Sequence, residues 1–139
     1  MASLSIDEQA LNAQVMARLD VFARGFVSTV ATEARRLAPR RTGELERGIQ
    51  PDPVRRTGPW VLETGVSGLA RHSAPVHEGA RPHVIRAKNA AALSFYWPKV
   101  GRRVFFARVN HPGNKPNPFL RNAAHRVASA DPRITIGTS

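Results

Sequence analysis

The residues best suited to metal binding are five histidines in the middle and C-terminal parts of the chain: His72, His77, His83, His111 and His125. Imidazole and carboxylate groups can together hold a catalytic zinc ion, so three of these histidines with Glu78 are a conceivable zinc site. The sequence has no His-x-x-x-His pair and no carboxylate-rich signature beside them. We therefore expect no metal and no cofactor, and we expect the histidines to act as hydrogen-bonding or interface groups.

Covalent and acid–base catalysis also lack their usual residues. The chain has no cysteine and no Gly-x-Ser-x-Gly elbow, and its carboxylates are few and scattered. Its glycines form neither a Gly-x-Gly-x-x-Gly motif nor a P-loop. The sequence therefore predicts a protein that is not an enzyme.

Basic residues dominate the charge. Lys and Arg number 21 against 10 acids, for a net charge of +11. Residues 1–34 carry two arginines and four acids (−2), whereas residues 35–139 carry 19 basic and six acidic residues (+13). An anionic partner, either nucleic acid or an acidic protein surface, would explain this balance. An arginine-rich coding bias would explain it equally well.

Two groups of arginines could contact phosphates. One lies around the end of the first helix: Arg35, Arg36, Arg40, Arg41 and Arg47. The other, Arg102, Arg103 and Arg108, alternates with apolar residues that include Phe105 and Phe106, whose rings could stack on bases. The alternative is that these rings face the core and the arginines are solvated. Because no helix-turn-helix, RNA-binding sheet motif or zinc finger is visible, any contact with nucleic acid is expected to be non-specific.

Composition indicates one soluble domain made in a reducing compartment. The chain has 139 residues, of which 42% are apolar. It contains no apolar run of the roughly 20 residues that span a bilayer. Its start lacks the basic and apolar regions of a secretory signal. We therefore expect no membrane partner.

One long helix is predicted over residues 5–37, with Ser5 or Asp7 as its N-cap and Pro39 as its stop. Apolar residues recur every three or four positions along it: Leu11, Val15, Leu19, Phe22, Phe26, Val30, Ala34 and Leu37. Some 30 residues make a rod of roughly 45 Å, which is long for so small a domain. We therefore expect this helix to pack partly against another molecule.

The rest of the chain predicts short helices and strands. Thr42 is placed to cap a helical turn that buries Leu45 and Ile49, a loop follows over residues 51–59, and Ser73 to Gly79 form a second turn. The sheet region, 60–110, contains four candidate strands: Trp60–Val66, His83–Ala87, Ala92–Trp97 and Arg102–Val109. The last two form an antiparallel hairpin through Lys99-Val100-Gly101.

The C-terminal part predicts a helix over 117–129, with Asn117 as its N-cap and Pro118 at its first position, and a flexible tail over 131–139. The predicted fold is α+β: a single domain, 1–139, in which the long N-terminal helix packs on an antiparallel sheet of about four strands, with a C-terminal helix.

Three segments, in this order, carry a resemblance to a known family. Residues 38–49 are similar to A-P-x-x-T-G-x-L-x-x-S-I, with Gly48 in place of the serine. Residues 73–80 are similar to Y-A-x-x-V-E/H-x-G-T, with Ser73 for the tyrosine, Ala80 for the threonine and one position fewer between them. Residues 111–123 match H-P-G-x-x-P-x-P-F-L-x-x-A. In order and spacing, the chain resembles the head–tail joining (neck, or tail-completion) proteins of tailed bacteriophages.

The resemblance implies a structural virion protein that forms a homo-oligomeric ring at the head–tail junction, assembled in the cytoplasm of the host bacterium. A hexamer is expected and a dodecamer is the alternative. The partners it implies are the head connector or stopper, the tail tube or terminator proteins, and phage DNA passing through the lumen. Two readings stay open beside it: a tail terminator ring that caps the tube, and a basic nucleic-acid-binding module.

The resemblance also suggests which residues meet partners. The expected subunit or partner interface consists of Thr42, Leu45, Pro75, His77, Gly79, His111, Pro112, Gly113, Phe119 and Leu120. The arginines expected to face the lumen or an acidic neighbour are Arg40, Arg41, Arg55, Arg56, Arg102 and Arg103.

Overall fold

The computed structural model describes residues 2–135, and the chain divides into two compact units. Unit 1 comprises the described residues of Met1–Ser73 and Pro118–Ser139, and unit 2 comprises Ala74–Asn117. The prediction of one head–tail joining domain over 1–139 did not include this division. Helices and antiparallel strands are mixed in the chain, so the predicted α+β class is confirmed.

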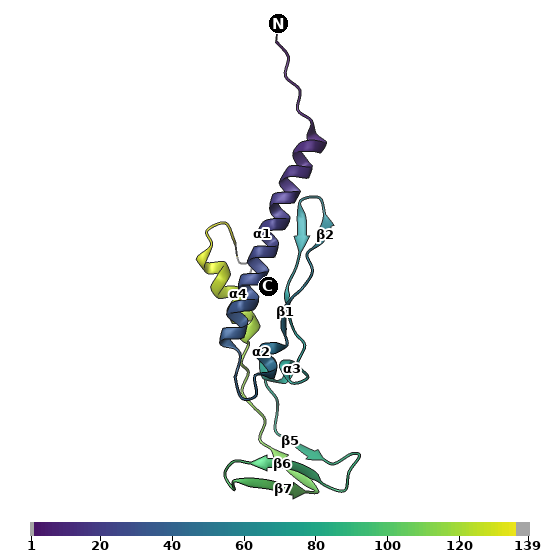
Figure 1. The fold of residues 1–139 in the computed structure, drawn as a ribbon, viewed down its shortest axis with the longest axis vertical. Helices are drawn as coiled ribbons and strands as arrows, with labels where there is room; N and C mark the ends of the chain where they lie inside the picture. Colours follow the sequence, from purple (N-terminus) through teal and green to yellow (C-terminus); the bar gives the residue numbers. More distant parts are fainter. Residues whose placement is uncertain (1, 136–139) are drawn as a thin grey trace. The chain divides into compact units, whose positions relative to one another are not determined.

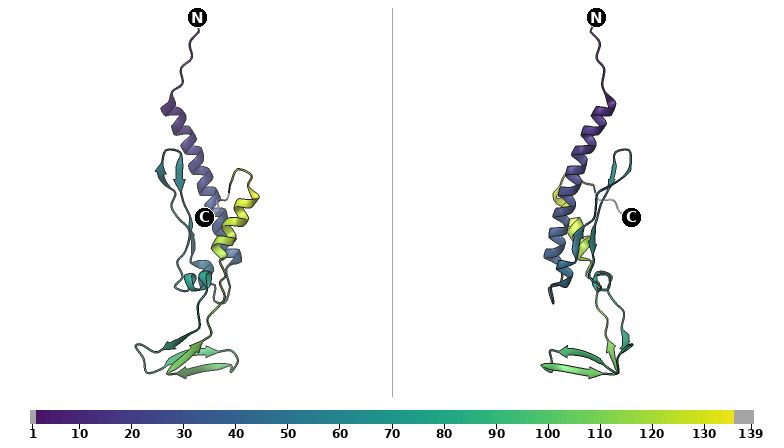
Figure 2. Two further views of the ribbon diagram at one scale, coloured as in Figure 1. Left: turned by 180° about the vertical axis from the view of Figure 1, so that it is seen from behind. Right: turned by 45° about the vertical axis from the view of Figure 1, so that its right-hand side comes forward.

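Unit 1 is organised by α1 (Glu8–Leu37) and α4 (Phe119–Ala130), which lie side by side (Figures 1 and 2). Asp7 caps α1, because its Oδ1 accepts a hydrogen bond of 3.0 Å from the amide of Ala10. The long helix was therefore predicted correctly, with Asp7 rather than Ser5 at its start. Pro118, not Asn117, is the N-cap of α4. The amide of Asn117 instead donates to the carbonyl of Val76.

Only the C-terminal half of α1 is buried. Its buried residues begin at Val27; Ala34 is fully enclosed, and so is Ala123 of the neighbouring helix α4. Side chains this small let two helix backbones approach closely. The largest fully buried side chains are Phe119, at the start of α4, and Ile49, each 1% exposed.

Short elements complete unit 1. The turn α2 (Glu44–Arg47) has Gly43 as its N-cap, with φ +73°, and no side chain caps it. The expected N-cap, Thr42, lies one residue earlier, and its Oγ1 accepts a long hydrogen bond of 3.4 Å from the amide of Glu44. The strand β1 (Ile49–Pro51) pairs with β4 (Val66–Gly68), and β2 (Arg55–Gly58) pairs with β3 (Val61–Glu63).

Unit 2 consists of most of α3 (Ser73–Glu78) and two ribbons. β5 (His83–Arg86) pairs with β8 (Arg108–His111), and β6 (Leu93–Trp97) pairs with β7 (Arg102–Phe106). The β6–β7 hairpin turns through Gly101, as predicted, with both Val100 and Gly101 donating to the carbonyl of Trp97. The predicted strand Arg102–Val109 is divided at a bend on Ala107, because its second part pairs with β5 instead of β6.

The strands differ from the predicted sheet of about four strands. Among the described residues there are eight, joined as four separate two-stranded antiparallel ribbons. Two of them, β1 and β2, lie in a region predicted mainly as loop. Pro51, Pro82 and Pro98 lie at or next to strand ends, where they offer no amide to lengthen the ladder.

The start of the predicted flexible tail folds back on α1. The guanidinium of Arg133 lies 4.6 Å from the centroid of the Phe22 ring and pairs with Asp131 at 2.6 Å. The remainder of the predicted tail, residues 136–139, lies outside the described residues.

Candidate functional site

The second and third motifs meet at one place in unit 2, the Gly79–Gly113 junction. Ala80 and Asn114 exchange two backbone hydrogen bonds of 3.0 and 2.9 Å. The side-chain amide of Asn114 also donates to the carbonyl of Pro75 at 3.0 Å. These bonds join α3 to the loop after β8. Two segments more than 30 residues apart in the sequence therefore cross at this junction.

Both glycines at this junction are required by the backbone. Gly79 has φ +83° and Gly113 has φ +78°, a region that L-residues with a side chain rarely occupy. A Cβ on Gly113 would collide with the backbone of Ala80 and Arg81, and one on Gly79 would lie 2.9 Å from Pro116. The glycines of the motifs thus have a steric explanation.

The histidines near the junction have defined roles. The Nδ1 atom of His111 accepts a 3.0 Å hydrogen bond from the amide of Gly113, so the ring carries its proton on Nε2 when neutral. His83 pairs with His111 across the β5–β8 ribbon, with ring centroids 5.0 Å apart. The Nδ1 atom of His83 lies 2.7 Å from the carbonyl of Arg81 and must donate to it. Both rings therefore form hydrogen bonds with backbone groups around the junction.

Two other predicted interface residues lie in the core of unit 1. Leu45 and Phe119 are buried in unit 1, so their side chains do not reach a surface where a partner could touch them. Leu120 is partly buried near Gly68 of β4. Thr42, Pro75 and Pro112 are exposed.

Unit 2 carries an open apolar surface, here called the aromatic face. It consists of one side of the β6–β7 hairpin, with neighbours from β5 and β8: Leu93, Phe95, Trp97, Val104, Phe106, Ile85 and Val109. The ring of Phe106 lies 6.0 Å from that of Phe95 and 6.1 Å from that of Trp97, so these rings share one side of the hairpin. Trp97 and Phe106 remain 38% and 39% exposed.

Two adjoining hollows lie on the aromatic face. One, of about 360 Å³, is lined by side chains that include Trp97, Phe106 and Arg108. The other, of about 330 Å³, is lined mainly by apolar groups, among them Ile85 and Leu93. All ten buried apolar residues of the described chain lie in unit 1, so unit 2 has no closed core of its own.

Charge in unit 2 is almost entirely positive. It has eight basic residues and one acid, Glu78, which gives +7 over 44 residues. The basic residues are Arg81, Arg86, Lys88, Lys99, Arg102, Arg103, Arg108 and Lys115. Most of the positive field inferred from the sequence therefore belongs to the unit that lacks a core.

The six predicted lumen arginines are all exposed, but they do not form one patch within a unit. Arg40 and Arg41 follow α1, and Arg40 pairs with Glu46 at 3.4 Å. Arg55 and Arg56 lie on β2 of the same unit. Arg102 and Arg103 lie on β7 in unit 2, where Arg103 donates to Ser94 at 2.9 Å.

Two arginines considered for phosphate binding instead hold unit 1 together. Arg35 donates from Nε and Nη2 to the carbonyl of Ile49, at 3.2 and 2.8 Å, which ties the end of α1 to β1. Arg36 pairs with Glu33, which also accepts from Arg126 of α4 at 2.9 Å. Hydrogen bonds from Arg36, and then from Arg126, lower the pKa of Glu33 to about 2.

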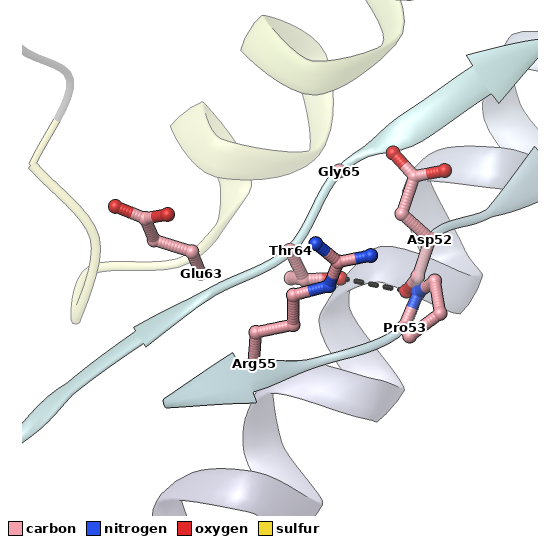
Figure 3. A pocket seen from close by; sticks show the side chains of 6 residues that line it. All are labelled: Asp52, Pro53, Arg55, Glu63, Thr64 and Gly65. Atoms are coloured by element: carbon pink, nitrogen blue, oxygen red, sulfur yellow. Dashed lines mark hydrogen bonds between the residues drawn. The ribbon is translucent and has the colours of Figure 1, made fainter. Parts of the chain in front are cut away.

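A separate polar hollow of about 340 Å³ lies beside β2 and β3 and is lined by Asp52, Pro53, Arg55, Glu63, Thr64 and Gly65 (Figure 3). Thr64 donates to the carbonyl of Asp52 at 2.9 Å, and Ser67 donates to its carboxylate at 2.6 Å. Glu63 extends away from Arg55 and Asp52. The carboxylate of Asp52 is thus engaged in holding a bend. No group of three or more metal-ligating side chains occurs among residues 2–135.

Comparison with protein-family models, with curated proteins and with solved structures gave no match to this chain. None of the helices in the described part of the chain is long and apolar enough to cross a bilayer.

Sequence reasoning missed the aromatic face as a site. The alternation of Phe95, Trp97, Val104 and Phe106 with polar residues indicated a strand with one apolar side, and the two alternatives left open for Phe106 were stacking on bases and facing a core. Composition offered one usable signal: from Ala74 to Asn117 the chain has a single acid and five prolines, which is little material for a closed core.

Proposed function

We propose that this chain is a structural virion protein of the phage neck, which forms a ring that joins the DNA-filled head to the tail tube. The proposal starts from the three ordered motifs. It assigns no reaction to the chain, and its partners are further copies of the chain, the neighbouring rings and the DNA that passes through.

The observation that carries the proposal is the structural role of the motif residues. Leu45 and Ile49 of the first motif and Phe119 of the third are buried together in unit 1. Gly79 of the second motif and Gly113 of the third meet in the junction of unit 2. If the motifs had matched by chance, their residues would not be expected to form both the core of unit 1 and the Gly79–Gly113 junction of unit 2.

The open state of unit 2 also favours an assembly protein over a free-standing module. Two-stranded ribbons need a helix or further strands against one face to be stable in water. Domains near 40 residues usually need disulfides, metals or oligomerisation, and the chain has no cysteine. A subunit that acquires its missing contacts from neighbours in a ring meets this requirement.

The rival function, non-specific nucleic-acid binding, is favoured by the other side of the β6–β7 hairpin. Tyr96 and Phe105 are 56% and 66% exposed there, beside Arg103. Exposed rings next to a guanidinium suit stacking on unpaired bases. A module of this kind binds nucleic acid as a free chain, with an affinity that falls steeply with salt.

The test is localisation on particles. Gold-labelled antibody against this chain is applied to tailed particles from cells that encode it, with antibody pre-absorbed on the purified chain as the control. Label confined to the head–tail junction is the expected result. Label elsewhere on the particle, or none, overturns the proposal.

Crosslinking on the same particles separates the two ring positions. A neck ring crosslinks to proteins of the head side and of the tail side, whereas a terminator ring crosslinks to the tail tube. For the rival function, titration of the purified chain with single-stranded and duplex DNA at two salt concentrations is decisive. Tight, salt-sensitive binding by the free chain, with no label at the junction, favours the module.

A further inference from the structure

The N-terminal end of α1, residues 8–20, is helical although none of its residues is buried. Among the described residues before Val27 none is buried. Yet this segment keeps an apolar stripe, with Leu11 50% and Val15 38% exposed, and the preceding Leu4 and Ile6 are exposed as well. A helix of about 13 residues is marginal in water unless an apolar face is covered. The segment therefore has the sequence of a packed helix and lacks the surface to pack on.

The aromatic face of unit 2 has the opposite deficiency. It offers the apolar side of a two-stranded hairpin, open at Trp97, Phe106 and Ile85. A helix laid against such a hairpin is one of the arrangements that makes it stable. The helical segment therefore lacks a surface to pack on, and the hairpin lacks a helix to cover its apolar side.

Their dimensions agree. The stripe from Leu11 to Leu19 covers nine residues, whose eight helical rises amount to about 12 Å. The five-residue strands β6 and β7 are each about 17 Å long. The helical stripe can therefore be covered along its whole length by one hairpin face.

Their charges are also complementary. Residues 4–20 have three acids, Asp7, Glu8 and Asp20, and one basic side chain, Arg18, for a net charge of −2. The aromatic face is bordered by Arg102 on the same side of the hairpin and by Arg108 in one of its hollows. Unit 2 as a whole carries +7, so it favours an apolar partner with acidic ends over a neutral or basic one.

We infer that the N-terminal segment of one copy, residues 4–20, docks on the aromatic face of unit 2 of the next copy. Such a contact is head-to-tail, because it joins two different surfaces, and repeated head-to-tail contacts close into a ring when the rotation permits. The inference names the subunit contact of the proposed ring and to that extent rests on the proposed function.

Engineered cysteines test it directly, because the described chain has no cysteine of its own. Full-length Leu11→Cys chains are mixed with full-length Trp97→Cys chains and oxidised. Ala13→Cys is the control for the helix, since residue 13 lies on the other side of α1 from the stripe. Tyr96→Cys is the control for the hairpin, since Tyr96 lies on its opposite side.

The expected result is a disulfide-linked dimer that forms fastest for the pair Leu11→Cys with Trp97→Cys, and more slowly as salt is raised. Equal rates for all four pairs, or no dimer from the stripe-to-face pair, would overturn the inference. The inference would also be overturned if a chain carrying both Leu11→Cys and Trp97→Cys formed a disulfide within itself while the mixture of the single variants formed no dimer.

A second measurement avoids cysteine chemistry. Leu11→Asp should weaken self-association in sedimentation equilibrium by about tenfold or more, because it removes an apolar contact and leaves a charge on apolar surface. Ala13→Asp, with the same charge off the stripe, should have little effect. Equal effects of both substitutions contradict the docking.

The two proposals fail differently. Antibody label at the junction without the stripe-to-face crosslink leaves the neck function standing and removes this contact. The crosslink without label at the junction leaves a self-associating protein whose place is not the neck.

Discussion

Removal of the Phe119 ring is the sharpest test of the core described for unit 1. Phe119 is 1% exposed and begins α4, where the third motif meets the long helix. Phe119→Ala deletes almost the whole buried ring and leaves a cavity, a change that costs about 3–5 kcal/mol in well-packed cores. Since domains of this size are stable by about 5–15 kcal/mol, the variant should lose a large part of its stability.

Urea unfolding followed by far-UV circular dichroism measures this loss, because α1, α2 and α4 all belong to unit 1. With slopes of about 1–3 kcal/mol per M, a loss of 3 kcal/mol moves the midpoint by about 1–3 M urea. Phe119→Leu, which retains most of the volume, should recover more than half of the loss.

The matched control is Phe105→Ala, which removes the same ring from a site that is 66% exposed. Surface substitutions of this kind change stability by about 0.5 kcal/mol or less. If Phe119→Ala moved the midpoint no further than Phe105→Ala, the described packing of α4 on α1 would be refuted.

Three further predictions concern single residues. Gly25→Ala should stabilise unit 1 by about 1 kcal/mol in the same urea series, because a Cβ there meets nothing within 4 Å and alanine favours helix; no gain would contradict the exposed helical position. Gly113→Ala should make unit 2 much more sensitive to trypsin than Gly101→Ala does. Both residues have positive φ, but only the Cβ at residue 113 would collide with backbone, so equal sensitivity would argue against the Gly79–Gly113 junction. Glu33→Gln should lower stability at neutral pH. Because the folded-state pKa of Glu33 is about 2 against an ordinary 4.5, the wild-type advantage is full above pH 4.5 and is lost as the pH falls toward 2. A constant gap in midpoint from pH 7 to pH 2 would contradict the pairing with Arg36 and Arg126.

Helices with local determinants were predictable from the sequence. The stripe of α1, the capping Asp7 and the stop at Pro39 all lie within the helix or next to it, so its end was placed correctly at Leu37. α4 was found for the same reason. Its N-cap was misplaced, since the amide of Asn117 donates to Val76, a residue 41 positions away that no local pattern indicates.

Strand pairing was less predictable because it depends on distant partners. β1 is three residues long, contains a proline, and exists through its pairing with β4. The sequence predicts one strand over Arg102–Val109. The structure divides it at Ala107, because its second part pairs with β5. Sequence alternation indicates that a strand has an apolar side and does not indicate whether anything covers that side.

The candidate site was predictable in part. The motif glycines and the buried Leu45 and Ile49 were singled out by their spacing, and each has a structural role. The engagement of Arg35 with a backbone carbonyl was not foreseen, since charge alone does not distinguish a solvated guanidinium from one that ties two elements together.

The division of the strands into separate ribbons has a consequence for polymerisation. Each strand in the described chain pairs with another strand on one side only, so the outer edges of the ribbons present amides and carbonyls that no strand pairs with. Two copies that approached edge to edge through β2 or β7 would bring Arg55 with Arg56, or Arg102 with Arg103, against like charges. Salt screens that repulsion, so edge-to-edge filament growth should increase with ionic strength. Docking of the acidic N-terminal segment should decrease under the same change, so a salt series separates ordered assembly of this protein from uncontrolled growth.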